Sequence, residues 1–76
     1  MDLREIRKNK GLTIEQVAAQ LSKSHSSVSN WESGKWEPQL TPEQTNVYCE
    51  ILGLTFDEFL KASRRSRKNW LEKQSR

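Results

Sequence analysis

Helix-start signals recur at close intervals along this chain and limit it to a set of short helices. Thr13, Thr41 and Thr55 are each followed three residues later by Gln or Glu. In this capping box the threonine hydroxyl accepts a hydrogen bond from the amide of the third residue, whose side chain bonds back to the threonine amide. Pro42 strengthens the second signal, because the first helical position has no use for an N–H. Helices are therefore predicted to begin next to all three threonines.

Helix-stop signals complement these starts. The glycines of the chain, Gly11, Gly34 and Gly53, fall where helical patterns end. Glycine is the residue that most readily takes the left-handed conformation that closes a helix. Ser24 is suited to cap one further helix at its N-terminus. Together these signals predict five helices, near residues 2–10, 14–21, 25–33, 42–52 and 55–62.

Apolar residues recur at helical spacing within these segments and indicate the fold class. Pairs of this kind are Leu3 with Ile6, Val17 with Leu21, Val28 with Trp31, and Val47 with Ile51. No window of alternating β-branched residues predicts a strand, and 76 residues allow one small core. The sequence therefore predicts an all-α fold, a compact five-helix bundle, with Trp31 and Cys49 in its core.

Charge is divided unevenly along the chain. Residues 1–62 carry seven Lys or Arg and nine Asp or Glu, a net −2, whereas residues 63–76 carry six and one, a net +5. The first segment must bind any polyanion through a local patch, because its overall field does not attract one. We expect residues 1–62 to form the folded domain and residues 63–76 to form a basic C-terminal tail or helical extension.

The tail admits three interpretations from sequence. No Gly or Pro stops a helix that continues from residue 55, so the tail could be a helix that packs Trp70 and Leu71 on the domain or on a second subunit. It could also be a disordered arm, or a solvated run without a binding role. Its candidate phosphate contacts are Arg64, Arg65, Arg67 and Lys68. Since the core is expected to be complete by Leu60, a chain cut after Ala62 is expected to keep its fold.

One predicted helix, 25–33, has a surface of unusual composition. Only three residues separate it from helix 14–21, so the two helices must cross steeply, with Ala18 against Val28. The side chains opposite Val28 and Trp31 are short and polar, namely His25, Ser26, Ser27, Ser29, Asn30 and Ser33. A solvated face is ordinarily rich in Glu and Lys, which favour helix formation. Small polar groups instead suit a helix that approaches the base edges of a DNA groove.

Ordered motifs along the chain complete this pattern. They are Leu3-Arg4-x-Ile6-Arg7, Gly11-Leu12-Thr13, Val17-Ala18-x-x-Leu21, Ser24-x-x-x-Val28-x-x-Trp31-Glu32-x-Gly34-Lys35, Pro38 and Leu52-Gly53-Leu54-Thr55-Phe56-Asp57-Glu58-Phe59-Leu60. With this set, residues 3–60 resemble the Cro/phage-repressor (Xre-like) helix-turn-helix family. The resemblance implies a lambda-repressor-like fold of five helices, whose third helix enters the major groove, usually as a dimer on a pseudo-palindromic site.

The resemblance also implies roles for individual residues. The positions that match base-contacting residues are His25, Ser26, Ser27 and Asn30. The positions that match phosphate-contacting residues are Ser24 and Lys35. Lys23 departs from the family, where an apolar turn residue is usual, and is expected to reach a phosphate instead. Arg7 and Glu32 match a partly buried ion pair that ties the first helix to the end of the recognition helix.

Some residues depart from the family pattern. Ile14 replaces a glutamine that commonly touches phosphate, and Trp36 stands where a basic residue is common. Ser22 replaces a glycine in the turn, so it must tolerate a strained backbone conformation if the turn is unchanged.

The sequence thus predicts a sequence-specific, DNA-binding transcriptional regulator of repressor type that reads the major groove with residues 25–33. Its partner would be double-stranded DNA, and a homodimer is possible. An adaptor of the same fold that binds proteins instead is the alternative, and a fragment of a larger regulator is a further possibility. No catalytic or metal-ligand pattern is recognised, so we expect no enzyme activity, cofactor, metal or small-molecule ligand. With neither a secretory signal nor a membrane-spanning run, a cytoplasmic location is expected.

Overall fold

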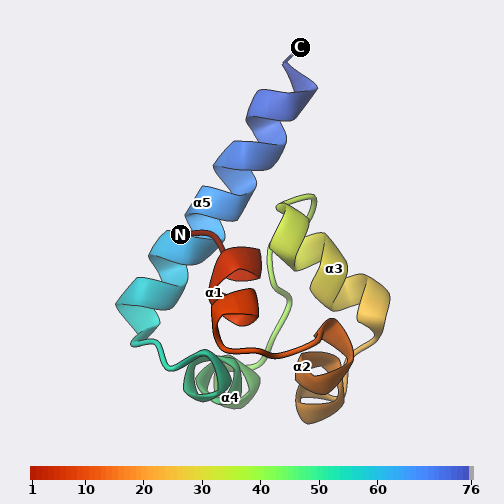
Figure 1. Cartoon of the computed structure of the whole chain (residues 1–76), viewed down its shortest axis with the longest axis vertical. Helices are drawn as coiled ribbons and strands as arrows, with labels where there is room; N and C mark the ends of the chain where they lie inside the picture. Colours follow the sequence, from red (N-terminus) through yellow and green to blue (C-terminus); the bar gives the residue numbers. More distant parts are fainter. Residues whose placement is uncertain (76) are drawn as a thin grey trace.

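Five helices make up the computed structural model, which describes residues 1–75 (Figure 1). They are α1 (Leu3–Asn9), α2 (Ile14–Leu21), α3 (His25–Ser33), α4 (Pro42–Leu52) and α5 (Phe56–Gln74). The predicted all-α class is confirmed, and the first four helices lie within two residues of their predicted bounds. Arg76, the last residue of the expected tail, lies outside the described residues.

The helix starts follow the predicted chemistry. The hydroxyls of Thr13, Thr41 and Thr55 each accept a hydrogen bond from the amide of the residue three positions later. The backbone amide of each threonine in turn donates to the side-chain oxygen of that Gln or Glu. Asp2 and Glu5 form a fourth capping box at α1, in addition to the three predicted ones. Ser24 caps α3 as predicted, since its hydroxyl accepts a hydrogen bond from the amide of Ser27 at 3.1 Å. Four of the five helix starts were therefore readable from local sequence.

An aromatic cluster lies at the centre of the core. Tyr48 of α4 lies between Trp31 of α3 and Phe59 of α5, with ring centroids 6.2 and 5.2 Å away. Trp31 and Cys49 are buried as predicted, and burial raises the pKa of the Cys49 thiol, which therefore behaves as a small apolar core residue. The core joins all five helices through Leu3, Val17, Ala18, Leu21, Val28, Trp31, Tyr48, Cys49, Leu52, Phe59 and Ala62.

Helix α5 differs most from prediction. It was expected to end near residue 62 but continues without interruption to Gln74, and its upper half rises past α1 and the end of α3 (Figure 1). Ser66 is 1 % exposed, and its hydroxyl accepts a hydrogen bond from the amide of Leu3 at 3.2 Å. Asn69 donates to the carboxylate of Asp2 at 3.1 Å. Ala62 and Ser66 are buried, so the expectation that the core is complete by Leu60 is wrong. The tail is helical, as one of the three interpretations had it, but Leu71 is 49 % exposed rather than packed on the domain and Trp70 is only half-buried.

Truncation after Ala62 should consequently destabilise the fold rather than leave it intact. The cut removes the hydrogen bonds that Ser66, Arg67 and Asn69 make with the rest of the domain. At roughly 1 kcal/mol for each bond, we expect the free energy of unfolding to fall by about 2–4 kcal/mol in urea titrations. A chain that ends after Trp70 keeps these bonds and is the matched control. Equal stability of the two truncated chains would contradict this view of α5.

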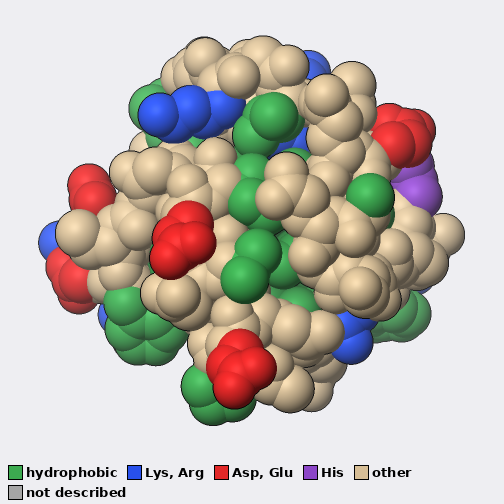
Figure 2. All heavy atoms as spheres, turned by 90° about the horizontal axis from the view of Figure 1, so that it is seen from below, with side chains coloured by type: hydrophobic (Ala, Val, Ile, Leu, Met, Phe, Trp, Pro, Cys, Tyr) green, Lys and Arg blue, Asp and Glu red, His purple; other side chains and the backbone are tan. Residues whose placement is uncertain are grey.

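The end of the molecule formed by α2 and α4 has little positive charge. In Figure 2 a strip of hydrophobic side chains crosses the middle of this face, with acidic side chains beside it and basic ones nearer the rim. Residues 36–60, which include α4, contain Glu37, Glu43, Glu50, Asp57 and Glu58 but no Lys, Arg or His. The α4 side of this end is therefore unsuited to a polyanion. None of the helices described in residues 1–75 is long and apolar enough to cross a membrane.

Candidate nucleic-acid interface

A tight turn sets the angle between α2 and α3. Ser22 ends α2 in the left-handed conformation, with φ of 55°, as the replacement of the usual turn glycine predicted. The amide of Lys23 donates to the carbonyl of Ala18 at 3.0 Å, which closes α2 and turns the chain toward α3. Ala18 and Val28 are both buried between the two helices. The turn and the core therefore fix the direction in which α3 projects.

The exposed face of α3 can be placed from its helical repeat. Val28, Trp31 and Glu32 are buried. At 100° per residue, the opposite direction falls on Ser26 and Asn30. Of the four predicted base-contacting residues, Ser26 and Asn30 lie nearest this direction, Ser26 exposed and Asn30 half-buried. His25, which is exposed, and Ser27, which is half-buried, lie toward the edges of the face. All four predicted residues thus lie on α3, but they differ in direction and in exposure to solvent.

Two of the edge residues already have partners. His25 Nε2 lies 3.5 Å from a carboxylate oxygen of Glu15, and both side chains are more than half exposed. The hydroxyl of Ser24 donates to the hydroxyl of Ser27 at 3.0 Å while it caps the helix. Glu15 was not singled out from the sequence, because nothing local indicates that the first turn of α2 lies beside the start of α3.

Lysines stand at both ends of this neutral face. Lys23 precedes α3 and is half-buried, whereas Lys35 follows it and is exposed. The ammonium of Lys35 lies 5.6 Å from the ring centroid of Trp36, which is within the range of a cation–π interaction. The nine residues of α3 span about 14 Å. The arrangement is a short uncharged helix face with one cation at each end.

A buried ion pair anchors the C-terminal end of α3. Arg7 Nε donates to Glu32 Oε2 at 2.6 Å, and Arg7 Nη1 donates to the carbonyl of Leu12 at 2.7 Å. Both side chains are less than one-tenth exposed. The predicted pair between the first helix and α3 is therefore confirmed, and the structure shows it to be buried rather than partly buried.

A family model described as helix-turn-helix matches residues 3–59, which include α2, the turn and α3. The chain belongs to the Cro/C1-type, Xre-like helix-turn-helix family. The second helix of this helix-turn-helix is α3.

A curated relative carries the same type of domain. The chain is 40 % identical over 58 residues to the HTH-type transcriptional activator BcrR of Enterococcus faecalis. The match covers 76 % of this chain and 28 % of that protein, so the helix-turn-helix chain corresponds to little more than a quarter of its relative's length. No solved structure is significantly similar to this helix-turn-helix chain.

The cations of the predicted tail have unlike surroundings on α5 of the helix-turn-helix chain. Arg64, Arg65 and Lys68 are exposed, and Lys68 lies 4.0 Å from the carboxylate of Glu72. Arg67 is half-buried and donates to the carbonyls of Gly34 and Lys35 at 2.9 and 3.0 Å. These four cations look alike in the sequence, and only their tertiary contacts distinguish Arg67 from the others.

Proposed function

We propose that this chain is the DNA-binding part of a transcriptional regulator and that α3 reads base edges in the major groove. The observation that carries the proposal is the neutral, hydrogen-bonding face of α3 with Lys23 and Lys35 at its two ends. The major groove of B-DNA is about 12 Å wide and admits one helix, so the lysines would meet phosphates on either side. The name of the relative, a transcriptional activator, agrees with this function.

Individual roles follow from the position of each side chain. Asn30, at the centre of the face, is the proposed bidentate partner of an adenine, because its amide offers one donor and one acceptor to N7 and N6. Ser26, His25 and Ser27 would make single hydrogen bonds to neighbouring bases. Ser24 would reach a phosphate by turning its hydroxyl proton away from Ser27. The proposed readout needs no cofactor.

The charge distribution favours approach from the α3 side. The end formed by α4 is acidic and would be repelled by phosphates. We propose Arg64, Arg65 and Lys68 as additional phosphate contacts of α5, and a homodimer on a two-fold symmetric site. Repression would need only occupancy of a promoter, whereas activation would need a further protein contact. An adaptor that binds proteins alone is not favoured, because the family model is that of a helix-turn-helix and the relative is named a transcriptional activator.

Selection of bound sequences from a random DNA pool, followed by a salt titration on the selected site, tests the proposal. We expect a single enriched motif, and symmetry in that motif would support the dimer. The logarithm of the association constant should fall linearly with the logarithm of salt concentration, by about 0.9 for each phosphate contacted. An absence of enrichment, or binding that does not depend on salt, would refute DNA readout by this chain.

Asn30→Ala should relax the preference at one base pair of that motif. Loss of a bidentate contact is expected to cost about 1–3 kcal/mol in binding to the selected site and little in binding to random DNA. Asn46→Ala is the matched control, because Asn46 is an exposed asparagine on α4, away from the proposed interface. Selection repeated with each variant provides the measurement. An unchanged motif for Asn30→Ala would exclude Asn30 as a base contact.

A further inference from the structure

Helix α5 approaches the end of the recognition helix closely enough for backbone contact. Gly34 ends α3 with φ of +86°. A Cβ atom at this position would overlap the carbonyl group of Ser66 and would lie 2.8 Å from the amide nitrogen of Arg67. The chain that leaves α3 therefore runs directly against the middle of α5.

Arg67 joins the two segments at this point. A single nitrogen of its guanidinium, Nη1, donates to two successive carbonyls, those of Gly34 and Lys35. On the other side of the loop, the amide of Trp36 donates to the carbonyl of Asn30 at 3.3 Å. The loop of residues 34–36 is thus held both by α3 and by α5, and it carries Lys35.

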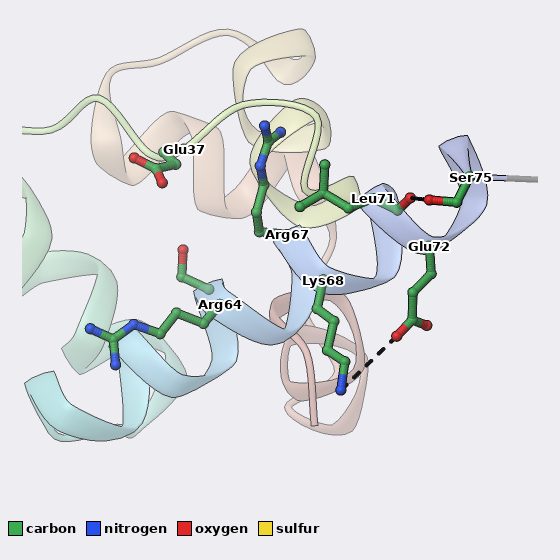
Figure 3. A pocket seen from close by; sticks show the side chains of 8 residues that line it. Glu37, Arg64, Arg67, Lys68, Leu71, Glu72 and Ser75 are labelled. Carbon is green, nitrogen blue, oxygen red and sulfur yellow. Dashed lines mark hydrogen bonds and ion pairs between the residues drawn. The ribbon is translucent and has the colours of Figure 1, made fainter.

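The neighbours of Arg67 on α5 behave differently. In Figure 3 the side chain of Arg67 runs toward the loop that follows α3, whereas Arg64 and Lys68 point away from that loop. Lys68 approaches Glu72 on its own helix. Of Arg64, Arg67 and Lys68, Arg67 is therefore the residue that is hydrogen-bonded to the loop at the end of the recognition helix.

We propose that Arg67 is a positioning residue of the DNA-binding surface, which acts through Lys35 rather than by binding phosphate itself. The proposal rests on the proposed function and replaces the role that the sequence suggested for Arg67. A loop that is ordered before binding loses less conformational freedom when Lys35 meets a phosphate. The cation–π contact with Trp36 further limits where the Lys35 ammonium can lie.

A double-mutant cycle on the selected DNA site separates the two roles. Lys35→Met and Arg67→Met should each weaken binding, by about two- to tenfold, the range expected when one long side chain must be ordered on binding. If Arg67 acts through Lys35, adding Arg67→Met to Lys35→Met should change affinity no further. The salt dependence should fall by about 0.9 for Lys35→Met and for the double variant, and it should stay unchanged for Arg67→Met, in which Lys35 still meets its phosphate at a greater entropic cost.

Arg64→Met is the matched control, since it removes the same charge from an exposed position on the same helix. Its effect should be additive with that of Lys35→Met, whether large or small. Additive effects of Arg67→Met and Lys35→Met, with the salt dependence reduced by both, would show that Arg67 binds phosphate and would overturn the proposal. Unchanged affinity of Arg67→Met would overturn it as well.

A second measurement without DNA distinguishes this proposal from the proposed function. In NMR relaxation, the backbone order parameters of Lys35 and Trp36 should fall below the rigid value of about 0.85 in Arg67→Met and should remain rigid in Arg64→Met. Wild-type protein that binds no DNA would refute the proposed function, whereas an equally rigid loop in both variants would refute the role of Arg67 alone. If Arg67→Met does not fold, Arg67→Lys takes its place, because its nitrogen is one bond shorter but its charge is kept. A phosphate contact would keep its affinity for DNA in this variant, whereas a positioning residue would lose affinity, because the shorter ammonium does not hold both loop carbonyls.

Discussion

Replacement of Gly34 by alanine is expected to unfold most of the domain at room temperature. The left-handed conformation of this residue costs an L-amino acid about 1–2 kcal/mol. The added Cβ would also overlap the Ser66 carbonyl, so α5 would have to separate from the end of α3. A domain of this size has only about 5–15 kcal/mol of stability. Circular dichroism should show a melting temperature many degrees lower or no cooperative transition.

Gly11→Ala isolates the conformational part of this effect. Gly11 has φ of +71°, but nothing lies within 4 Å of the position that its Cβ would occupy. This variant should therefore lose only about 1–2 kcal/mol and should keep the two-dimensional NMR spectrum of the native fold. If the two variants melt at the same temperature, the close contact between α3 and α5 does not exist in solution.

Glu32→Ala should cause the second large loss of stability. Its removal leaves the buried Arg7 guanidinium without a counter-charge, and breaking a buried pair from one side costs about 3–5 kcal/mol. Burial and then the negative charge of Glu32 raise the pKa of the Tyr48 hydroxyl, while Arg7 opposes this effect. In Glu32→Gln, where the shape is kept, ultraviolet titration should therefore find Tyr48 ionising at lower pH than in the wild type.

Lys61→Ala is the control for the ion pair. Lys61 and Asp57 are 3.2 Å apart, but both side chains are about three-quarters exposed. Loss of such a surface pair should change the free energy of unfolding by less than about 0.5 kcal/mol in urea titrations. If Glu32→Ala is as mild as Lys61→Ala, water reaches the Arg7–Glu32 pair and the packing of α1 on α3 is looser than the structure indicates.

The helix boundaries that were predicted well depend on neighbouring residues. Each capping box needs only a threonine and the third residue after it, so Thr13, Thr41 and Thr55 could be recognised in isolation. The end of α5 has no such signal. Its continuation is stabilised by Ser66 and Asn69, whose partners lie near the N-terminus, and their polar side chains are typical of a solvated surface in sequence.

The candidate site shows the same division. The outward face of α3 follows from helical periodicity and from the buried positions of Val28 and Trp31, so Ser26 and Asn30 could be located from sequence. The roles of Glu15 and Arg67 depend on contacts with other helices, ten and more than thirty residues away along the chain. Periodicity within one helix contains no information on such contacts.

Because α5 is continuous, a displacement of its C-terminal part is transmitted to the end of α3. The nineteen residues of α5 extend for about 28 Å, from the aromatic core to turns that stand clear of the other helices. Ser66, near the middle of α5, is the point at which this helix contacts Gly34. A rigid protein fused in helical register to α5 would therefore take a defined orientation relative to any DNA held by α3. A tilt of that fused protein would therefore apply force, through Arg67, to the loop that carries Lys35.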